Sequence, residues 1–453
     1  LRVRRRARRV IAESIQNIAN ALFMPWVVAV LLGTGLFLTV RLRFVQFRRF
    51  GDAVRAMLAR QAPGAGGVLT PFQAFMTALG ASVGTGNIAG VATAIISGGP
   101  GALFWIWVYG LVATAIKFSE AVLAIEFRRV DGAQVQSGPM YYLRDGLKSP
   151  ALAWVYALLA GVGALTTTPF TQPNSIAVAI NAVFGVPTWI VGIVVALLVA
   201  AVILGGIRSI GRAAEAVAPL KVGLYLVGGL VVIVTFADRL PHVLSLVVSE
   251  ALSPRSALGF GLFVAMRYGI ARSVYASEAG YGTAAVAYGT AKTSDPAQQG
   301  LQAVMEVFII SFVTTTLSAL TILVSGVAEE AIAARQAGNA FLTSTAAVAA
   351  AFDAAVPSVG GWVVAFCVLL FGYTTLTGWA YYGEQFLEYL FGRRIVRPYR
   401  WVYCLLIPLG AVLAPEVVWA WGDLMNALQI FPNVIGLIGL SAIAAKYATS
   451  RAR

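Results

Sequence analysis

Charged and metal-binding residues are scarce in this 453-residue chain. Charged residues make up 11% of the sequence, against about 25% in a typical soluble domain, which argues against a soluble protein. The only histidine, His242, lies in a predicted loop, so a metal site built from several histidines is excluded. The two cysteines, Cys367 and Cys404, lie in apolar segments and give neither a disulfide framework nor a zinc-binding spacing.

Apolar residues dominate instead, at 59% of the sequence with a mean hydropathy of +0.81. A membrane-spanning helix needs about 20 mainly apolar residues, and stretches near that length recur along the whole chain. We therefore predict an all-α, polytopic membrane protein that forms a single transporter-sized domain over residues 1–453. Eleven spans are predicted, near 20–40, 69–97, 101–126, 151–183, 187–205, 217–237, 258–287, 300–326, 358–390, 399–414 and 418–447. The shorter alanine-rich stretch 339–355 is predicted to be a re-entrant or interfacial helix.

The net charge of +14 is interpreted as a topology signal rather than a nucleic-acid signal. Lys and Arg are retained on the cytoplasmic side of a membrane. Most of them fall in one set of alternate loops, which includes Arg48, Arg128, Lys221 and Arg397, and in the C-terminal tail. The loop after the first span and the C-terminus are therefore expected in the cytoplasm. This orientation places six N-terminal arginines outside, in conflict with the same rule.

The ten spans after the first divide into two groups of five, at 69–237 and 258–447, joined by a connecting segment at 238–257. Residues 1–68 hold an N-terminal segment and one extra helix. Because five is odd, the second group starts on the opposite side of the membrane, which is the arrangement of an inverted repeat. Each group opens with a glycine-interrupted helix, and such pairs point to a binding site at mid-membrane.

The first interruption, TALGASVGTGNIAG at 77–90, has the residue types of a broken helix. Unwound backbone offers N–H groups to a carboxylate and C=O groups to a hard cation such as Na⁺. The glycines also form two G-x-x-x-G spacings, Gly80 with Gly84 and Gly86 with Gly90, which are typical of close helix packing. Packing and ligand binding both remain open for this segment alone. The matching interruption RYGIARSVYASEAGYG at 267–282 favours ligand binding.

Longer motifs carry a resemblance to a known family. The block GGPGALFWIWVYGLVATAIKFSE at 98–120 resembles the signature of the alanine/glycine:cation symporters, also called sodium:alanine symporters. The blocks ASVGTGNIAGVATA, ARSVYASEAGYGTA and FGYTTLTGWAYYGE are similar to other blocks of that family, and the resemblance covers residues 20–446. It implies a leucine-transporter-like (LeuT) fold of the APC superfamily. That fold has ten core helices in a five-plus-five inverted repeat, with broken first and sixth core helices, and here one extra N-terminal helix.

The resemblance also implies a substrate site. The segment VGTGN at 83–87 resembles the substrate-facing break of the first core helix, so its amides are expected to meet the polar head of an amino acid. The implied substrate-binding residues are Thr85, Gly86, Asn87, Gln172, Ser273, Tyr275, Ser277 and Trp379. The threonines at 166–168 are expected to bond their own helix and to lie outside the site.

A sodium site is implied beside it. In the wider fold, carbonyls just before the first break and hydroxyls of the eighth core helix bind the ion. The corresponding residues here are Gly80, Val83, Thr374 and Thr375. The two threonine hydroxyls have an alternative role, because they can bond back to carbonyls of their own helix. Na⁺ is the expected coupling ion, and H⁺ is the alternative.

Buried charges need partners, because an unpaired charge at mid-bilayer costs at least about 2.5–3.5 kcal/mol. Lys117 and Glu120 are three residues apart on one helical face and are predicted to form a structural pair. Arg272 and Glu278 flank the second break. They are predicted to form a gating or helix-end salt bridge, with cation or proton coupling as the alternative.

These features together predict a secondary active transporter rather than an enzyme. We expect sodium-coupled symport of small neutral amino acids, alanine and glycine, into the cell by alternating access across the inner (plasma) membrane. The alternatives are proton coupling, or transport of an amine or a nucleobase on the same fold. A channel and an intramembrane hydrolase are weaker candidates, and the sequence has neither H-E-x-x-H nor a Walker A motif. The expected partners are the amino acid and the lipid bilayer, not a nucleic acid.

Overall fold

The computed structural model describes residues 14–18, 21–58, 66–131, 134–253, 261–342 and 344–450. Within these ranges the chain is mainly helical, as expected for a sequence whose backbone must satisfy its own hydrogen bonds in lipid. The arginine-rich N-terminus, whose side of the membrane was in conflict, lies outside the described residues.

The first half of the chain contains the first broken helix and five long helices. A π-helical turn, Phe23–Val27, leads into α2, and a second one, Tyr142–Gly146, follows α8. The α-helices of this half are α2 (Val28–Arg41), α3 (Val45–Arg48), α4 (Phe50–Leu58), α5 (Pro71–Ser82), α6 (Ala89–Gly98), α7 (Ala102–Glu126), α8 (Pro139–Tyr141), α9 (Pro150–Thr166), α10 (Thr168–Phe184), α11 (Thr188–Ile203), α12 (Gly206–Thr235) and α13 (Leu240–Leu252). Short 3-10 segments lie at Thr85–Asn87 and Ala237–Arg239.

The second half repeats this pattern of a short broken helix followed by long ones. Its α-helices are α14 (Leu262–Ser277), α15 (Ala284–Tyr288), α16 (Pro296–Phe308), α17 (Thr315–Val324), α18 (Val327–Gln336), α19 (Ser344–Ala355), α20 (Gly360–Phe391), α21 (Val396–Val412), α22 (Pro415–Gly439) and α23 (Ser441–Thr449). A π-helical segment, Ile309–Thr314, joins α16 to α17, and a 3-10 turn, Arg393–Ile395, precedes α21.

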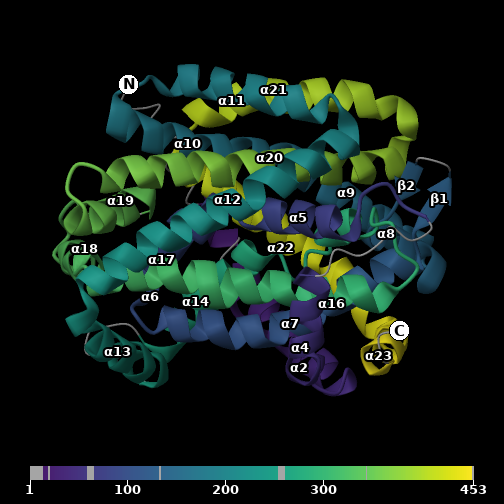
Figure 1. The fold of residues 1–453 in the computed structure, drawn as a ribbon, viewed down its shortest axis with the longest axis horizontal. Helices are drawn as coiled ribbons and strands as arrows, with labels where there is room; N and C mark the ends of the chain where they lie inside the picture. Colours follow the sequence, from purple (N-terminus) through teal and green to yellow (C-terminus); the bar gives the residue numbers. More distant parts are fainter. Residues whose placement is uncertain are drawn as a thin grey trace.

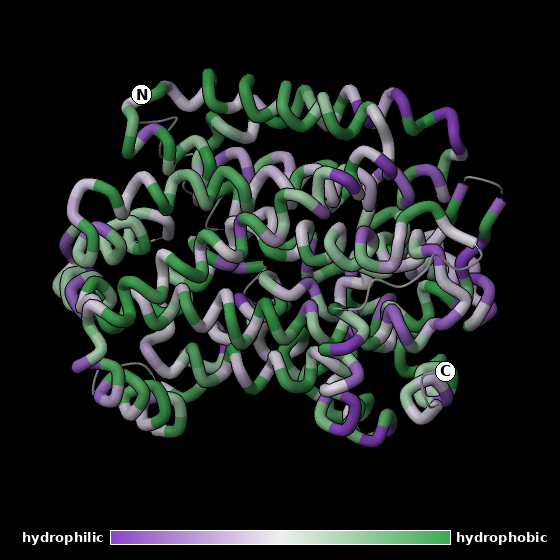
Figure 2. Tube along the Cα trace, viewed as in Figure 1, coloured by the Kyte–Doolittle hydropathy of each residue, from purple (hydrophilic) through white to green (hydrophobic). Residues whose placement is uncertain are grey.

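Several helices are suited to cross a membrane. By length and composition, five of the described helices pass, and up to seven pass if each of two bent pairs forms one span. Three shorter apolar helices add to these. Every predicted span overlaps at least one helix, but the number eleven stays a prediction. Figure 2 shows hydrophobic residues along most of the helices, and hydrophilic residues gathered toward the right of the view.

The broken helix α5–α6 lies inside the bundle. The first arm, α5, begins with a capping box, in which Thr70 accepts from the N–H of Gln73 and Gln73 accepts from the N–H of Thr70. α5 packs against α12, α16 and α20, and α6 packs against α14 and α19. In Figure 1, α11 and α21 form the upper layer, and α13, α18 and α19 lie at the left end. The break is therefore held between helices of both halves of the chain.

A short hairpin departs from the all-α prediction. Strands β1 (Arg129–Asp131) and β2 (Gln134–Gln136) pair antiparallel and lie at the right end of Figure 1, near the C-terminus. Just before β1, the Arg128 guanidinium donates to the carbonyls of Gly66, Gly289, Ala291 and Thr293. Arg128 thus joins the segment before α5 to the segment after α15.

Candidate functional site

The first break forms one wall of the site. α5 ends at Ser82, the 3-10 turn Thr85–Asn87 follows, and α6 resumes at Ala89 with its axis bent by 60° from that of α5. The break predicted at 77–90 is therefore confirmed. The backbone of residues 83–88 leaves the helix at this point and is buried.

Two glycines of the break allow side chains to approach its backbone closely. A Cβ on Gly84 would lie 2.6 Å from Oγ1 of Thr375, and a Cβ on Gly86 would lie 2.6 Å from a ring carbon of Tyr275. Both separations are too short for a real side chain, so only glycine fits. Gly84 and Gly86 therefore allow close packing, and both also line the pocket described below. The two alternatives that the sequence left open thus do not exclude each other.

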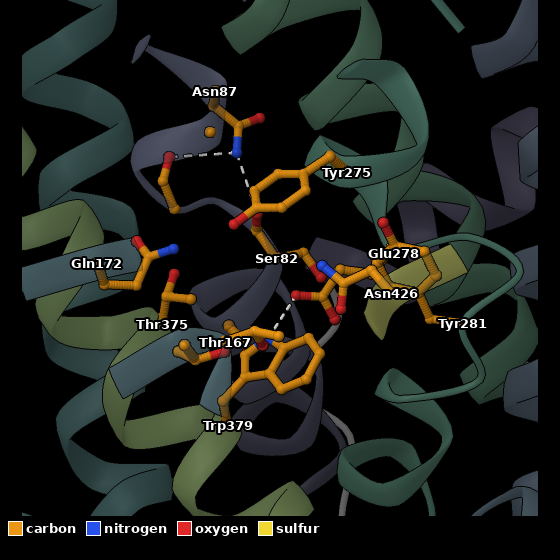
Figure 3. Close-up of a pocket in the computed structure, with 14 residues that line it drawn as sticks. Ser82, Asn87, Thr167, Gln172, Tyr275, Glu278, Tyr281, Thr375, Trp379 and Asn426 are labelled. Carbon is orange, nitrogen blue, oxygen red and sulfur yellow. Dashed lines mark hydrogen bonds between the residues drawn. The ribbon is translucent and has the colours of Figure 1, made fainter. Parts of the chain in front are cut away.

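Asn87 holds the break together from within. Its side-chain nitrogen donates to the carbonyl of Ser82 at 3.0 Å and to that of Gly84 at 3.4 Å. On the other side, Ser318 of α17 donates to the backbone carbonyl of Asn87 at 2.7 Å. Figure 3 shows the amide of Asn87 pointing back into the turn. Asn87 therefore stabilises the turn through its side-chain amide, and it also lines the pocket.

The second break forms the opposite wall. α14 ends at Ser277, Glu278 adopts a left-handed backbone conformation with φ 54°, and α15 begins at Ala284. The interruption predicted at 267–282 is thus confirmed. The Glu278 carboxylate accepts from the Thr283 hydroxyl at 2.7 Å and from the Trp379 indole N–H at 2.6 Å.

A small pocket of about 20 Å³ lies between the two breaks (Figure 3). A cavity of this volume holds about one water molecule, so side chains nearly fill the site in this conformation. The lining residues come from both breaks and from α5, α10, α14, α20 and α22. They are Ala81, Ser82, Gly84, Gly86, Asn87, Thr167, Thr168, Gln172, Tyr275, Glu278, Tyr281, Thr375, Trp379 and Asn426. Because many of these side chains are polar, the pocket becomes a site for a small polar solute when they move apart.

Five of the predicted substrate residues line this pocket: Gly86, Asn87, Gln172, Tyr275 and Trp379. The side chain of Gln172 points toward the first break, where its Oε1 accepts a backbone N–H at 3.1 Å. Trp379 is 3% exposed, so its indole ring faces the protein interior rather than lipid. The two breaks and α20 thus bring together residues that lie far apart in the sequence.

The other three predicted substrate residues are buried but do not line the pocket. The backbone N–H of Thr85 donates to Gln172, and the Thr85 hydroxyl has no hydrogen-bond partner among the described residues. The Ser273 hydroxyl donates to the Ile106 carbonyl of α7 at 3.2 Å. The Ser277 hydroxyl donates to the Ser273 carbonyl of its own helix at 2.7 Å. Both serines therefore serve helix packing in this conformation.

The four predicted sodium ligands come together, but around a lysine. Lys221 is fully buried in α12, and its Nζ donates to the carbonyls of Gly80 at 3.0 Å and Val83 at 2.5 Å. It also donates to the Thr374 hydroxyl. The Thr375 hydroxyl donates weakly to the Gly80 carbonyl at 3.5 Å. Counting Lys221 among the cytoplasmic loop charges was therefore wrong, because α12 begins at Gly206 and encloses it.

The predicted salt bridge beside the second break is also wrong. Arg272 pairs with Asp423 of α22 at 3.1 Å instead of with Glu278. Its guanidinium also lies over the rings of Tyr275, at 5.9 Å, and Trp419, at 5.6 Å. Since Tyr275 lines the pocket, the pair between α14 and α22 closes one side of the site.

A second group of buried charges lies behind the pocket. Lys117 pairs with Glu306 of α16 at 3.3 Å and donates to the Ser277 carbonyl at 2.8 Å. Glu120 accepts instead from the N–H groups of Gly280 and Gly282, each at 3.0 Å. The predicted Lys117–Glu120 pair is thus replaced by contacts with other helices. These contacts fix the second break in place.

The Glu120 carboxylate has one further donor. The side-chain nitrogen of Asn433, on α22, donates to it at 2.8 Å and also to the Gly280 carbonyl. The Glu120 network therefore joins α7, the second break and α22.

The model of the sodium:alanine symporter family matches residues 8–451, nearly the whole chain. The chain belongs to the sodium:alanine symporter family. The family resemblance predicted from the 98–120 block is thereby confirmed. Family members are transporters, so the prediction that the chain is not an enzyme is confirmed as well.

Relatives within the sodium:alanine symporter family are similar over almost their full length. The sodium/alanine symporter AgcS of Methanococcus maripaludis is 37% identical over 437 residues, which cover 95% of this chain and 95% of AgcS. The amino-acid carrier protein AlsT of Bacillus subtilis is 32% identical over 96% of this chain and 91% of AlsT.

A solved structure shares the fold of this family member at much lower identity. A variant of the manganese transporter of Eremococcus coleocola matches with a TM-score of 0.55 and 17% identity, over 82% of this chain and 77% of the transporter. This likeness concerns the fold alone, which is mainly helical.

Sequence reasoning missed several lining residues of this symporter-family site. They are Ser82, Thr167, Thr168, Glu278, Tyr281 and Asn426. Thr167 and Thr168 were assigned to helix bonding, and Thr167 does bond the Gly163 carbonyl of its own helix. The kink between α9 and α10 nevertheless turns both threonines toward the pocket. Pro169 and Pro173 were the signal for this kink, whereas Asn426 lies in an apolar stretch without a motif.

Proposed function

We propose that the protein carries small neutral amino acids, alanine and glycine, across the membrane together with sodium. The observation that carries the proposal is the small polar pocket between two helix breaks, in a member of the sodium:alanine symporter family. Broken helices meeting at mid-membrane are the usual binding arrangement of secondary transporters. Movement of the helices around the pocket then exposes it to alternate sides.

The two walls offer groups of opposite charge to a zwitterion. The backbone N–H of Gly86, in the turn before α6, suits the substrate carboxylate, whereas the N–H of Asn87 donates to the Gly84 carbonyl at 3.0 Å. The carboxylate of Glu278 on the opposite wall suits its ammonium group. Gln172 supports the first wall by accepting the N–H of Thr85. Thr85 is proposed to support the first break through its backbone N–H, and Ser273 and Ser277 are proposed to support the packing of α14. None of the three is proposed to contact the substrate directly.

Aromatic side chains limit the substrate to a small one. Tyr275 packs against the backbone of Gly86, and Trp379 extends across the pocket to Glu278. Together they occupy the volume that a larger side chain would need. We propose that the site admits alanine and glycine, the smallest amino acids, when the helices around it move apart.

Sodium supplies the driving force, because the substrate carries no net charge. One cation crossing about 100 mV contributes about 2.3 kcal/mol. A tenfold sodium gradient adds about 1.4 kcal/mol. The sum supports roughly 500-fold accumulation with one ion per substrate. Three of the four predicted sodium ligands, Gly80, Val83 and Thr374, accept from the Lys221 ammonium in this structure, so we propose that the transported ion binds outside this group of oxygens while the lysine is in place.

The proposal includes an orientation and a repeat. We assign eleven spans, with 1–68 as the N-terminal segment and extra helix and with 69–237 and 258–447 as the inverted repeats of a LeuT-like fold. The two bent helices at corresponding places support this assignment. Strand β2 and the positive residues Arg393, Arg394, Arg397 and Arg400 line one cleft. Strand β2 and the C-terminus lie toward the right of Figure 1, which supports a cytoplasmic C-terminus in the inner membrane.

Uptake into proteoliposomes tests the function. Labelled alanine should accumulate when a sodium gradient is imposed and should stop accumulating when the gradient is collapsed at unchanged ionic strength. A proton gradient without sodium is the second arm, because proton coupling is the alternative. Amines and nucleobases are added as competitors. Alanine uptake that is unchanged by loss of the sodium gradient would falsify the coupling, and competition by an amine alone would change the substrate class.

A further inference from the structure

Lys221 sits where a cation of the expected symport would bind. Three helices meet at its ammonium group: α12 supplies the lysine, the C-terminal end of α5 supplies two carbonyls, and α20 supplies the Thr374 hydroxyl. The three N–H donors of the ammonium thus have three oxygen partners. The Phe371 ring lies 5.1 Å from the same nitrogen and covers another side.

No carboxylate neutralises this charge. Across residues 66–131, 134–253 and 261–342 and the rest of the described chain, no ion pair includes Lys221. Lys117, the other fully buried lysine in the described ranges, has the Glu306 carboxylate at 3.3 Å. Neutral oxygens at a helix C-terminus are the ligands that a transporter offers to Na⁺, because the helix dipole is negative at that end. The surroundings of Lys221 are therefore those of a bound metal cation.

We propose that Lys221 is a tethered cation that takes the place of a sodium ion between α5, α12 and α20. Sodium that drives transport then binds elsewhere while the lysine is seated. This inference deepens the proposed function and rests on it for the identity of the ion. A sodium ion can leave such a ring of oxygens during each cycle, but a side chain of α12 cannot leave the protein. The lysine thus links the first break to α20 without consuming a transported ion.

Two substitutions distinguish the contribution of the lysine from that of the oxygens around it. Lys221→Ala removes the ammonium and leaves space beside the carbonyls of Gly80 and Val83. Thr374→Ala removes the hydroxyl ligand. Thr377→Ala is the matched control, because Thr377 is a buried threonine of the same helix whose hydroxyl donates to the Thr374 carbonyl and not to the lysine.

The measurement is thermal unfolding of the purified full-length protein in detergent, titrated with NaCl against choline chloride at constant ionic strength. In the otherwise wild-type protein, Thr374→Ala should change the sodium concentration that gives half-maximal thermal stabilisation by less than about twofold, because the Thr374 hydroxyl contacts the lysine rather than a sodium ion. Lys221→Ala should gain a sodium-dependent stabilisation absent from the wild type. In that background, Thr374→Ala should raise the half-maximal sodium concentration about tenfold, the effect of losing one ligand. Thr377→Ala should have no such effect in either background.

Two results would overturn the inference. The first is a tenfold weaker sodium response for Thr374→Ala in the otherwise wild-type protein, which would mean that sodium displaces the lysine. The second is a Lys221→Ala variant with the sodium response of the wild type. If Lys221→Ala does not fold, the Thr374→Ala measurement still decides the first point, and Lys221→Gln provides an uncharged side chain for the second. The titration uses no amino acid, so failure of alanine uptake would leave its outcome independent.

Discussion

At the scale of single residues, Trp379 combines two roles: it fills the pocket and donates to Glu278. Trp379→Phe removes the donor and part of the ring. We expect weaker alanine binding, by about tenfold for a lost hydrogen bond to a carboxylate, together with competition by larger amino acids such as valine. Uptake of labelled alanine with competing amino acids measures both effects.

A second tryptophan provides the control for that substitution. Trp107 of α7 also donates its indole N–H, to Thr316 at 2.8 Å, but it does not line the pocket. Trp107→Phe should leave the substrate range unchanged. A Trp379→Phe variant that rejects larger amino acids as strongly as the wild type would show that Trp379 does not set the size limit.

Gln172 is predicted to support the first break through one hydrogen bond. Gln172→Leu keeps the volume but leaves the Thr85 N–H buried without an acceptor, which should lower the free energy of unfolding by about 1–3 kcal/mol. Gln172→Glu keeps an acceptor, so its stability should stay closer to that of the wild type while its affinity for alanine falls. Denaturation and binding are measured on the same preparations. Equal stability of Gln172→Leu and the wild type would contradict this role.

Residue types alone predicted part of the site. The residues Gly86, Asn87, Gln172, Tyr275 and Trp379 were found because breaks and motifs mark them. Lys221 was missed because a lysine near a predicted span end looks like a loop charge, and only the packing of α12 against α5 shows what it contacts. Ser273 and Ser277 lie on the right helix, but their side-chain directions depend on tertiary contacts.

At the scale of helices, the Arg272–Asp423 pair joins α14 to α22 over the pocket. Asp423→Asn leaves the Arg272 charge without its partner, which is costly at a site this buried. We expect the two helices to separate more often. A reporter cysteine in the pocket, Thr168→Cys, should then react with a membrane-impermeant thiol reagent about tenfold faster, the equivalent of about 1.4 kcal/mol.

The reporter has a low background, since both native cysteines, Cys367 and Cys404, are buried. Asp52→Asn is the matched control, because Asp52 pairs with Arg49 and Arg55 within or beside α4, and none of the three lines the pocket. Equal labelling rates in the Asp423→Asn and Asp52→Asn backgrounds would argue against a gating role for the pair.

Both helix breaks could be predicted because glycine and polar residues are out of place in apolar spans. The β1–β2 hairpin could not, because its strands have three residues each, which is too short for an alternating pattern to indicate a strand. Its position depends on contacts of the adjoining Arg128 with carbonyls more than 60 residues away in the sequence. A local sequence pattern does not reveal contacts between residues so far apart in the chain.

At the scale of the whole molecule, the proposed orientation makes a direct prediction. Ala337 follows α18, Ser450 follows α23, and both are exposed. Figure 1 shows α18 at the left end of the bundle and α23 toward the right. In intact cells, an impermeant thiol reagent should label Ala337→Cys directly and Ser450→Cys only after lysis. The reverse pattern would place the C-terminus outside and would invert the assignment of every loop.

The number of membrane spans is difficult to count from hydropathy, for a physical reason. Hydropathy detects apolar length, but the broken helices α5–α6 and α14–α15 divide their spans into short polar-containing pieces. Length and composition therefore recognise five to seven spans in the described residues, although helices overlap all eleven predicted ranges. The polar residues and glycines that interrupt these helices shorten the apolar segments by which spans are counted.

The Glu120 network bears on how the protein is made. The carboxylate of Glu120, in α7, accepts from Gly280 and Gly282 and from Asn433 near the end of the chain. During synthesis, α7 enters the membrane about 160 residues before its first partners and about 310 before its last. The nascent chain must therefore shelter a carboxylate in the bilayer, in water or at the insertion machinery until α22 has been synthesised. Truncated chains that end before α22 should be recognised by membrane quality control.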